Sequence, residues 1–219
     1  KNIYKFLMMV FASSLLTTGC IKETFPTDGA TQEQISGSTT ALESMVGAIA
    51  VNMAYPYSAF GSGENYGFDF GYPGLMCALD ACTGDVICTA GDEAANYDWF
   101  WYWERGTMMG PTMVLCGFPW NTYFSFMKSC NDVIGMVDMS KELSSGEKSA
   151  LGAAKAFRAT FYLDMARQYE ALEVTDSACS KYDISAVKEL TIPVITESTT
   201  EAQARNNPRL KRERMFEWI

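Results

Sequence analysis

Apolar residues recur every three to four positions along most of this chain, a spacing typical of amphipathic helices. It predicts helices over about residues 37–55, 75–84, 119–138 and 144–172, and a last one after Pro208. The apolar stripe of the third helix would contain Trp120, Tyr123, Phe124, Met127, Ile134 and Val137. That of the fourth would contain Leu151, Ala154, Phe157, Phe161, Met165 and Tyr169. The pattern therefore favours a mainly helical protein.

Local signals mark where several of these helices begin. Pro119 suits the first turn of the third helix, where a missing N–H costs little. Ser144 and Glu147 have the spacing of a capping box at the start of the fourth. Asn207 and Pro208 would cap the last helix.

The helices are joined by long irregular segments. Residues 173–191 form a polar connection, and Thr191–Thr196 is predicted to be a short extended piece fixed by Pro193. Paired amphipathic helices with small residues at their crossings suggest a helical-repeat protein, although no strict 34-residue repeat is visible. We therefore predict a mainly α fold, a TPR-like helical-repeat superhelix with long irregular loops.

The first twenty residues have the pattern of a bacterial lipoprotein signal. Lys1 and Lys5 supply a basic start, Ile3–Leu16 is largely apolar, and small residues lead into Cys20. We predict a signal peptide over residues 1–19, lipidation of Cys20, and a polar tether over residues 20–36. The alternative is an ordinary secretory signal in which Cys20 is incidental.

Charge and composition exclude several classes of function. Without residues 1–19 the chain keeps 15 basic and 26 acidic residues, a net charge of −11, which argues against binding nucleic acid. The absence of histidine excludes Ser-His-Asp and Cys-His catalysis and histidine-ligated metal sites within this chain. We therefore predict a binding protein and not an enzyme, with no catalytic residue, no metal site and no cofactor.

Six cysteines remain beside Cys20, and their spacings are irregular. They are Cys77, Cys82, Cys88, Cys116, Cys130 and Cys179, with no CxxC pair among them. An exported protein could join them in disulfides. We favour the other interpretation, in which they are small buried apolar residues.

An aromatic segment within residues 92–119 provides the candidate ligand site. Its centre runs Tyr97, Asp98, Trp99, Phe100, Trp101, Tyr102, Trp103. Flat aromatic rings can stack on sugar rings while polar neighbours bind the hydroxyl groups. Our candidates for ligand contact are Asn96, Tyr97, Asp98, Trp99, Trp101, Tyr102 and Arg105. The alternative is that the tryptophans fill the core.

The order of several motifs resembles the SusD/RagB outer-membrane nutrient-binding lipoproteins of Bacteroidetes. The third helix reads Trp120, Tyr123, Phe126, Cys130, Asn131 and Ile134, close to the family's W-x₂-Y-x₂-I-x₄-N-x₂-I with Phe126 replacing isoleucine. Residues 153–169 are close to the family's A-E-A-K-F-L-R-A-x-x-Y-F-D-L-V-R-x-Y-G. Residues 192–196 are like its G-I-P-L-V-T, and Arg214–Ile219 resembles its E-V-Y-D-F-I. Within these motifs, we expect Arg158, Asp164 and Arg167 to make structural pairs rather than to bind ligand.

The resemblance implies a function and a partner. Such proteins bind oligosaccharides, or in the RagB branch peptides, and deliver them to a SusC-type TonB-dependent transporter. The chain would be anchored to the outer membrane by its lipid and exposed at the cell surface. Residues 37–219 would be the N-terminal helical part of a SusD-like domain whose C-terminal half is missing. The alternative outside transport is a helical-repeat scaffold or adhesion lipoprotein.

Overall fold

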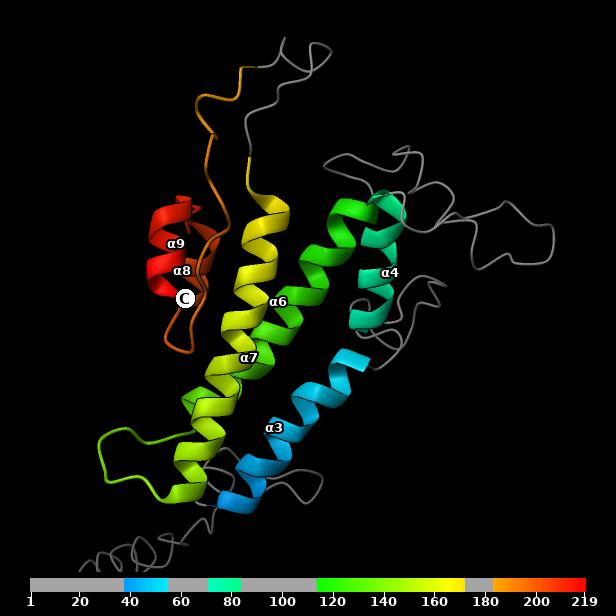
Figure 1. Cartoon of the computed structure of the whole chain (residues 1–219). Coiled ribbons are helices and arrows are strands. Elements are labelled where there is room, and N and C mark those ends of the chain that lie inside the picture. The colour runs from blue at the N-terminus through cyan, green and yellow to red at the C-terminus, as the bar shows by residue number, and fades with distance from the viewer. Residues whose placement is uncertain (1–37, 55–70, 84–113, 172–182) are drawn as a thin grey trace, which may run out of the picture. The chain divides into compact units, whose positions relative to one another are not determined.

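The described part of the chain is mainly α-helical. The computed structural model describes residues 38–54, 71–83, 114–171 and 183–219 (Figure 1). Its helices are α3 (Thr39–Ala54), α4 (Gly71–Thr83), α6 (Val114–Gly135), α7 (Ser145–Tyr169), α8 (Glu201–Arg205) and α9 (Arg212–Trp218). Within these ranges no β-sheet forms, and isolated bridges join Ala171 to Lys188 and Leu190 to Lys211. The predicted helical class is therefore confirmed.

The fourth predicted helix begins as the sequence indicates. Ser144 caps α7: its hydroxyl accepts from the Glu147 N–H at 3.2 Å, and the Glu147 carboxylate accepts from the Ser144 N–H at 2.9 Å. The two side chains thus satisfy N–H groups that have no acceptor within the helix. These bonds hold the pKa of the Glu147 carboxyl below its usual range.

The prediction for Pro119 is wrong, because α6 begins at Val114 and the proline lies inside the helix. Only the first few N–H groups of a helix lack an intrahelical acceptor, so a proline at this position removes a bond from the ladder. Two side chains bond to other carbonyls of the turn around it. Thr122 Oγ1 donates to the Phe118 carbonyl at 2.9 Å, and the Tyr169 hydroxyl donates to the Cys116 carbonyl at 2.7 Å.

The start of the last helix is also corrected. Lys211 is the N-cap of α9, whereas the Asn207 amide donates to the Val194 carbonyl and holds the preceding segment. A short helix that the sequence analysis did not predict, α8, lies just before. Its capping box joins Thr200 to Gln203. The Asn-Pro pair therefore belongs to a connection between two helices.

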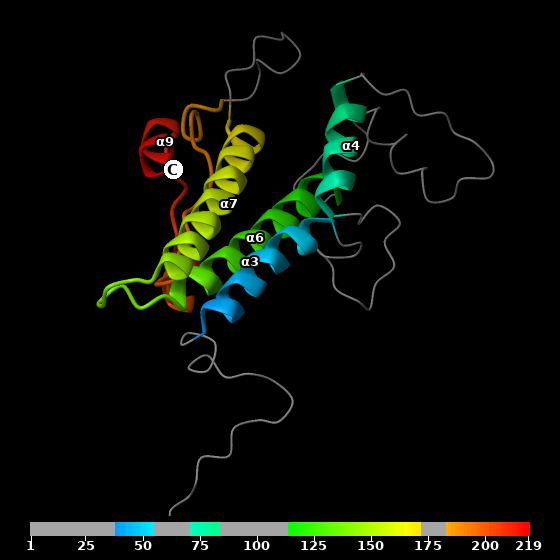
Figure 2. The ribbon, with the colours of Figure 1, turned by 60° about the horizontal axis from the view of Figure 1, so that its bottom comes forward.

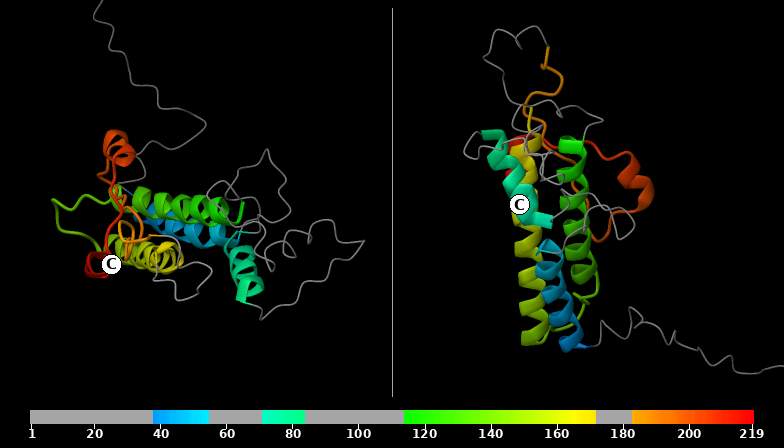
Figure 3. Two further views of the ribbon diagram at one scale, coloured as in Figure 1. Left: turned by 90° about the horizontal axis from the view of Figure 1, so that it is seen from above. Right: turned by 90° about the vertical axis from the view of Figure 1, so that its right-hand side faces the viewer.

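Three helices enclose the core. The α6 and α7 helices lie side by side, joined by residues 136–144, and α3 packs against both (Figures 1 and 2). Seen from above, α3 runs beside α6 and α7 (Figure 3). At one point α7 leaves almost no room: a Cβ added to Gly146 would lie 2.0 Å from Thr39 Cγ2 of α3. A glycine at this position therefore allows the two helices to approach.

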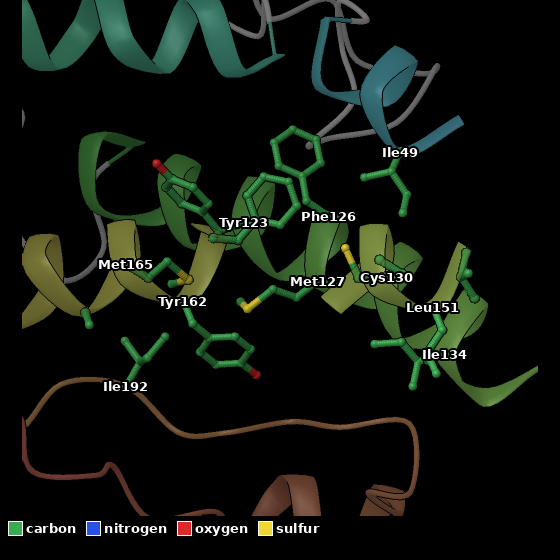
Figure 4. Packing of buried hydrophobic residues seen from close by; sticks show 14 of the residues in the cluster. Ile49, Tyr123, Phe126, Met127, Cys130, Ile134, Leu151, Tyr162, Met165 and Ile192 are labelled. Carbon is green, nitrogen blue, oxygen red and sulfur yellow. The ribbon is translucent and has the colours of Figure 1, made fainter. Parts of the chain in front are cut away.

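Large side chains from α6 and α7 fill the space between these helices (Figure 4). The largest fully buried ones include Tyr123, Phe126 and Met127 of α6, with Phe161 and Met165 of α7. Phe126 and Phe161 lie 5.2 Å apart between ring centroids. Both predicted apolar stripes face this core, although Trp120, Phe124, Phe157 and Tyr169 are only partly buried.

The C-terminal part of the chain returns along α7. Residues 189–192 pair with residues 210–212 through backbone bonds, among them Thr191 N to Leu210 O at 2.7 Å and Leu210 N to Ile192 O at 3.1 Å. Ile192 and Met215 are buried against the helices, and α9 lies beside α7 (Figure 1). This return places residues 194–199 and α9 where the candidate site forms.

Candidate functional site

The site residues that the sequence predicts lie outside the described residues. This holds for the lipidation site Cys20 and for the ligand candidates Asn96, Tyr97, Asp98, Trp99, Trp101, Tyr102 and Arg105. The candidate site in the described part of the chain is therefore formed by other residues. It lies where α6, α7, α9 and the 194–199 segment meet.

Arg158 of α7 is the centre of this site. Its Nη1 donates to Asn131 Oδ1 of α6 at 2.8 Å and to Glu197 Oε2 at 2.7 Å. Its guanidinium also lies over the Trp218 ring of α9, 5.4 Å from the centroid. We call Asn131, Arg158, Glu197 and Trp218 the Arg158 cluster. One side chain thus joins two helices, a loop and the last helix.

The 194–199 segment is fixed next to this cluster by backbone bonds at Ile195. The Tyr162 hydroxyl donates to the Ile195 carbonyl at 2.9 Å and accepts from the Ile195 N–H at 2.8 Å. The Asn131 amide donates to the same carbonyl at 3.0 Å. In Figure 4 the Tyr162 hydroxyl points toward the C-terminal segment, away from the core between the helices. Burial raises the pKa of Tyr162 to about 12, so the hydroxyl remains a donor at physiological pH.

A cleft of about 430 Å³ opens beside the Arg158 cluster. It is lined by Lys155, Arg158, Ala159, Thr196, Glu197, Ser198, Trp218 and Ile219. We call it the Arg158 cleft. Residues with charged, hydroxyl and indole groups line this space, and its volume is within the range of small-molecule sites.

The charges in the cleft stabilise one another. Burial alone would raise the pKa of the Glu197 carboxyl, but its own backbone N–H, the Arg158 guanidinium and the Lys155 charge together hold it below the usual range. Glu197 is therefore ionised at neutral pH. Arg158 is largely buried, with 12% of its side chain exposed, against 33% for Glu197.

Two further hollows border the same segment. One is lined by Phe124, Met127, Lys128, Asn131 and Asp132 of α6 together with Ile195, Thr196, Glu197 and Thr199. The other is lined by Val194, Ser198, Thr199, Gln203, Asn206, Asn207 and Pro208. The 194–199 segment thus separates three surface hollows.

A second polar cluster joins α4 to the other helices. Asp164 accepts from the Tyr72 hydroxyl at 3.0 Å and from the Tyr123 hydroxyl at 3.2 Å, and Gln168 donates to Tyr123 at 3.1 Å. Burial, followed by the Asp164 charge, raises the pKa of both tyrosines. Arg158 and Asp164 therefore both make structural pairs, as the sequence predicts.

No disulfide and no metal site is present among the residues that the structure describes. Cys77, Cys116 and Cys130 are free thiols, of which Cys130 is buried and Cys77 exposed. Burial raises the pKa of Cys130 to about 12, so this thiol is unreactive. In the same ranges no group of three or more cysteine or acidic side chains could hold a metal ion, and no helix is long and apolar enough to cross a membrane.

Most of this site is not predicted by the sequence. Arg158 and Asn131 stand out there as members of motifs, but no pattern gives a role to Lys155, Glu197 or Trp218. These three residues lie on different elements, and no local spacing links them. The one available signal was their presence in or beside the motifs around residues 153–169, 192–196 and 214–219.

Comparison of the chain with protein-family models, with curated proteins and with solved structures found no match.

Proposed function

We propose that this chain is a SusD-like outer-membrane lipoprotein that binds oligosaccharides and delivers them to a SusC-type TonB-dependent transporter. Acyl chains on Cys20 would anchor it, since several chains together give stable membrane attachment. Its action is binding and lid motion over the transporter, with no bond made or broken. Ligand contact is assigned to the aromatic segment, with Trp99 and Trp101 as stacking platforms.

The observation that carries this proposal is how the family-like motifs meet. Asn131 belongs to the first motif, Arg158 to the second and Ile195 to the third. Arg158 donates to Asn131, and Asn131 donates to the Ile195 carbonyl. If the motifs resembled the family only by chance, there would be no reason for their polar residues to bond to one another. The bonds between them therefore support a scaffold like that of the SusD/RagB family.

The same contacts support a finer view of the fold. We infer that α6 and α7 form one antiparallel pair of a TPR-like superhelix, and that α3 and α4, which also contact each other, belong to a neighbouring pair. In such an arrangement each pair covers the apolar face of the next. Loops at the ends of the pairs would then carry the ligand site.

The first test is purification of the lipidated protein from detergent-solubilised outer membrane, with the co-purifying proteins identified by mass spectrometry. We expect a stoichiometric TonB-dependent barrel. Partners from the cell wall, with no barrel, would favour a scaffold or adhesion role instead. A Cys20→Ser variant should lose membrane attachment, whereas Cys77→Ser, which changes an exposed free cysteine, should keep it.

The second test concerns the ligand. Trp99→Ala and Trp101→Ala are expected to weaken oligosaccharide binding by about tenfold or more, because aromatic anchors dominate such sites. Phe216→Ala is the matched control, since Phe216 is an exposed aromatic on α9, 44% accessible. Sugar binding intact in both tryptophan variants would remove the site assignment. Binding of peptides in place of sugars would favour a RagB-like role.

A further inference from the structure

The Arg158 cleft contains hydrogen-bond donors that the described residues leave unused. Both bonds of Arg158 go through Nη1, so Nε and Nη2 have no acceptor in the described part of the chain. Lys155 Nζ and the Trp218 indole N–H also have no hydrogen-bond acceptor among the described residues. Arg158 is only 12% exposed, and buried donors without a partner are costly. The cleft is therefore suited to a ligand rich in acceptors.

The charge of the cleft restricts this ligand further. Among the side chains that line the cleft, Lys155 and Arg158 are positive and Glu197 is negative, so these side chains carry one positive charge in excess. The whole chain, in contrast, has a net charge of −9. A group with a single negative charge would balance the cleft. The free Nε and Nη2 edge of a guanidinium matches two oxygens of one oxyanion.

The remaining lining residues indicate what carries that oxyanion. Thr196 and Ser198 contribute hydroxyl groups, and Glu197 contributes a charged acceptor, so the cleft can bind donors as well as acceptors. The Trp218 ring adds an apolar surface beside them. A ring with several hydroxyl groups and one oxyanion uses all of these features, whereas a purely apolar acid does not.

We propose that the Arg158 cleft binds a sugar residue that carries one oxyanion group, either a carboxylate or a sulfate ester. Lys155 and the free edge of Arg158 hold the oxyanion, while Glu197, Thr196 and Ser198 bind the ring hydroxyls. The choice of a sugar rests on the proposed function. The cleft is lined by other residues than those assigned in the aromatic segment, so the two assignments are tested by different variants.

The test is calorimetric titration of the full chain with glucuronate, glucose 6-sulfate, glucose and acetate. Glucuronate or the sulfate is expected to bind at least about tenfold more tightly than glucose or acetate, and raised salt should weaken that binding. The better of the two charged sugars identifies the oxyanion. Acetate binding as tightly as glucuronate would overturn the sugar assignment, and glucose binding as tightly would overturn the role of the charge.

Variants of one helix connect the binding to the cleft. Lys155→Gln should weaken binding of the charged sugar about tenfold, because a charge-assisted bond is lost. Lys148→Gln is the matched control: Lys148 is an exposed lysine about two turns earlier in α7 and does not line the cleft. Equal effects of the two changes would overturn the proposal. Arg158 is left intact because it also supports the fold.

A second variant keeps the test independent of charge. Trp218→Phe retains a ring beneath Arg158 but removes the indole N–H, and it should weaken binding by a few-fold while leaving the thermal midpoint nearly unchanged. No effect on binding would remove Trp218 from the site. If a TonB-dependent barrel co-purifies but no charged sugar binds, this inference fails and the proposed function stands. If charged sugars bind but no barrel co-purifies, this inference stands and the proposed function fails.

Discussion

The contact between α6 and α7 and the contact between α7 and the 194–199 segment are made in different ways. Between the two helices lie aromatic and aliphatic side chains such as Phe126, Met127 and Phe161, each nearly inaccessible. The 194–199 segment is instead held by directed bonds at Ile195 and Glu197, although Ile192 and Met215 on either side of it are buried in the core. The first contact depends on buried apolar area, and the second on the position of a few polar atoms.

This difference teaches that the two regions should respond to different changes. Apolar burial tolerates small shifts of position but loses free energy with every deleted carbon atom. A hydrogen bond loses its free energy as soon as one partner is absent or displaced. Removal of apolar volume should therefore weaken the whole unit, and removal of a polar atom should release the 194–199 segment alone.

The largest expected effect comes from Phe161→Ala. Phe161 is fully buried and its ring lies near those of Tyr123, Phe126 and Phe157, so the change leaves a cavity. We expect the free energy of unfolding to fall by about 3–5 kcal/mol, measured by urea denaturation. Phe216→Ala, at an exposed ring, is the control and should change it by less than about 1 kcal/mol. Similar losses in both variants would contradict the description of the core.

The next effect comes from Tyr162→Phe. The change keeps the ring but removes the hydroxyl that serves both the N–H and the carbonyl of Ile195. We expect a loss of about 1–3 kcal/mol, because an N–H is left without its partner. Hydrogen exchange should speed up in residues 190–199 and remain slow in α6 and α7. Uniformly faster exchange would show that the two contacts are not separable.

A third change tests how closely α3 approaches α7. Gly146→Ala would place a Cβ 2.0 Å from Thr39 Cγ2, so we expect a loss of about 1–3 kcal/mol by overpacking. Gly152→Ala is the control in the same helix: its Cβ would meet nothing within 4 Å, and a gain of about 0.5–1 kcal/mol is expected. Addition of Thr39→Ala to Gly146→Ala should restore most of the loss. Failure of this rescue would place the strain elsewhere.

The smallest effect depends on pH. Because the pKa of Glu197 is lowered in the folded state, its contribution to stability is present above the usual glutamate value of about 4.5 and is lost as the pH falls through the folded value. Glu197→Gln should therefore reduce stability at pH 7 and make little difference near pH 3. Since the carboxylate is partly exposed and screened, we expect no more than about 1 kcal/mol. A deficit of equal size at both pH values would mean that shape, not charge, matters at this position.

The helical part of the fold could be predicted from the sequence because its signals are local. Apolar spacing identified α3, α6 and α7, and two residues sufficed to predict the cap of α7. The local signals for a helix start were misleading at Pro119 and at Asn207. Pro119 lies inside α6, where Thr122 and Tyr169 bond to carbonyls of the surrounding turn. Asn207 bonds to a carbonyl thirteen residues away instead of capping α9.

The candidate site could be predicted only in part, for a related reason. Asn131 and Arg158 stood out as members of motifs, but nothing in the spacing indicated that they bond to each other. Glu197 joins them because Tyr162 fixes Ile195, two residues earlier, and Trp218 joins them because α9 packs against α7. These contacts of Glu197 and Trp218 with Arg158 depend on the path of the chain after α7, and local sequence patterns do not predict that path.

The two-sided bond between Tyr162 and Ile195 has a consequence for which substitutions the protein can accept. The hydroxyl reaches only main-chain atoms, so the identity of the side chain at position 195 does not enter this contact. With respect to this bond, evolution or a protein engineer is free to exchange the residue at 195, with one exception. Proline, already accepted at position 193, has no N–H to offer, so moving it two positions along would sever half of the link.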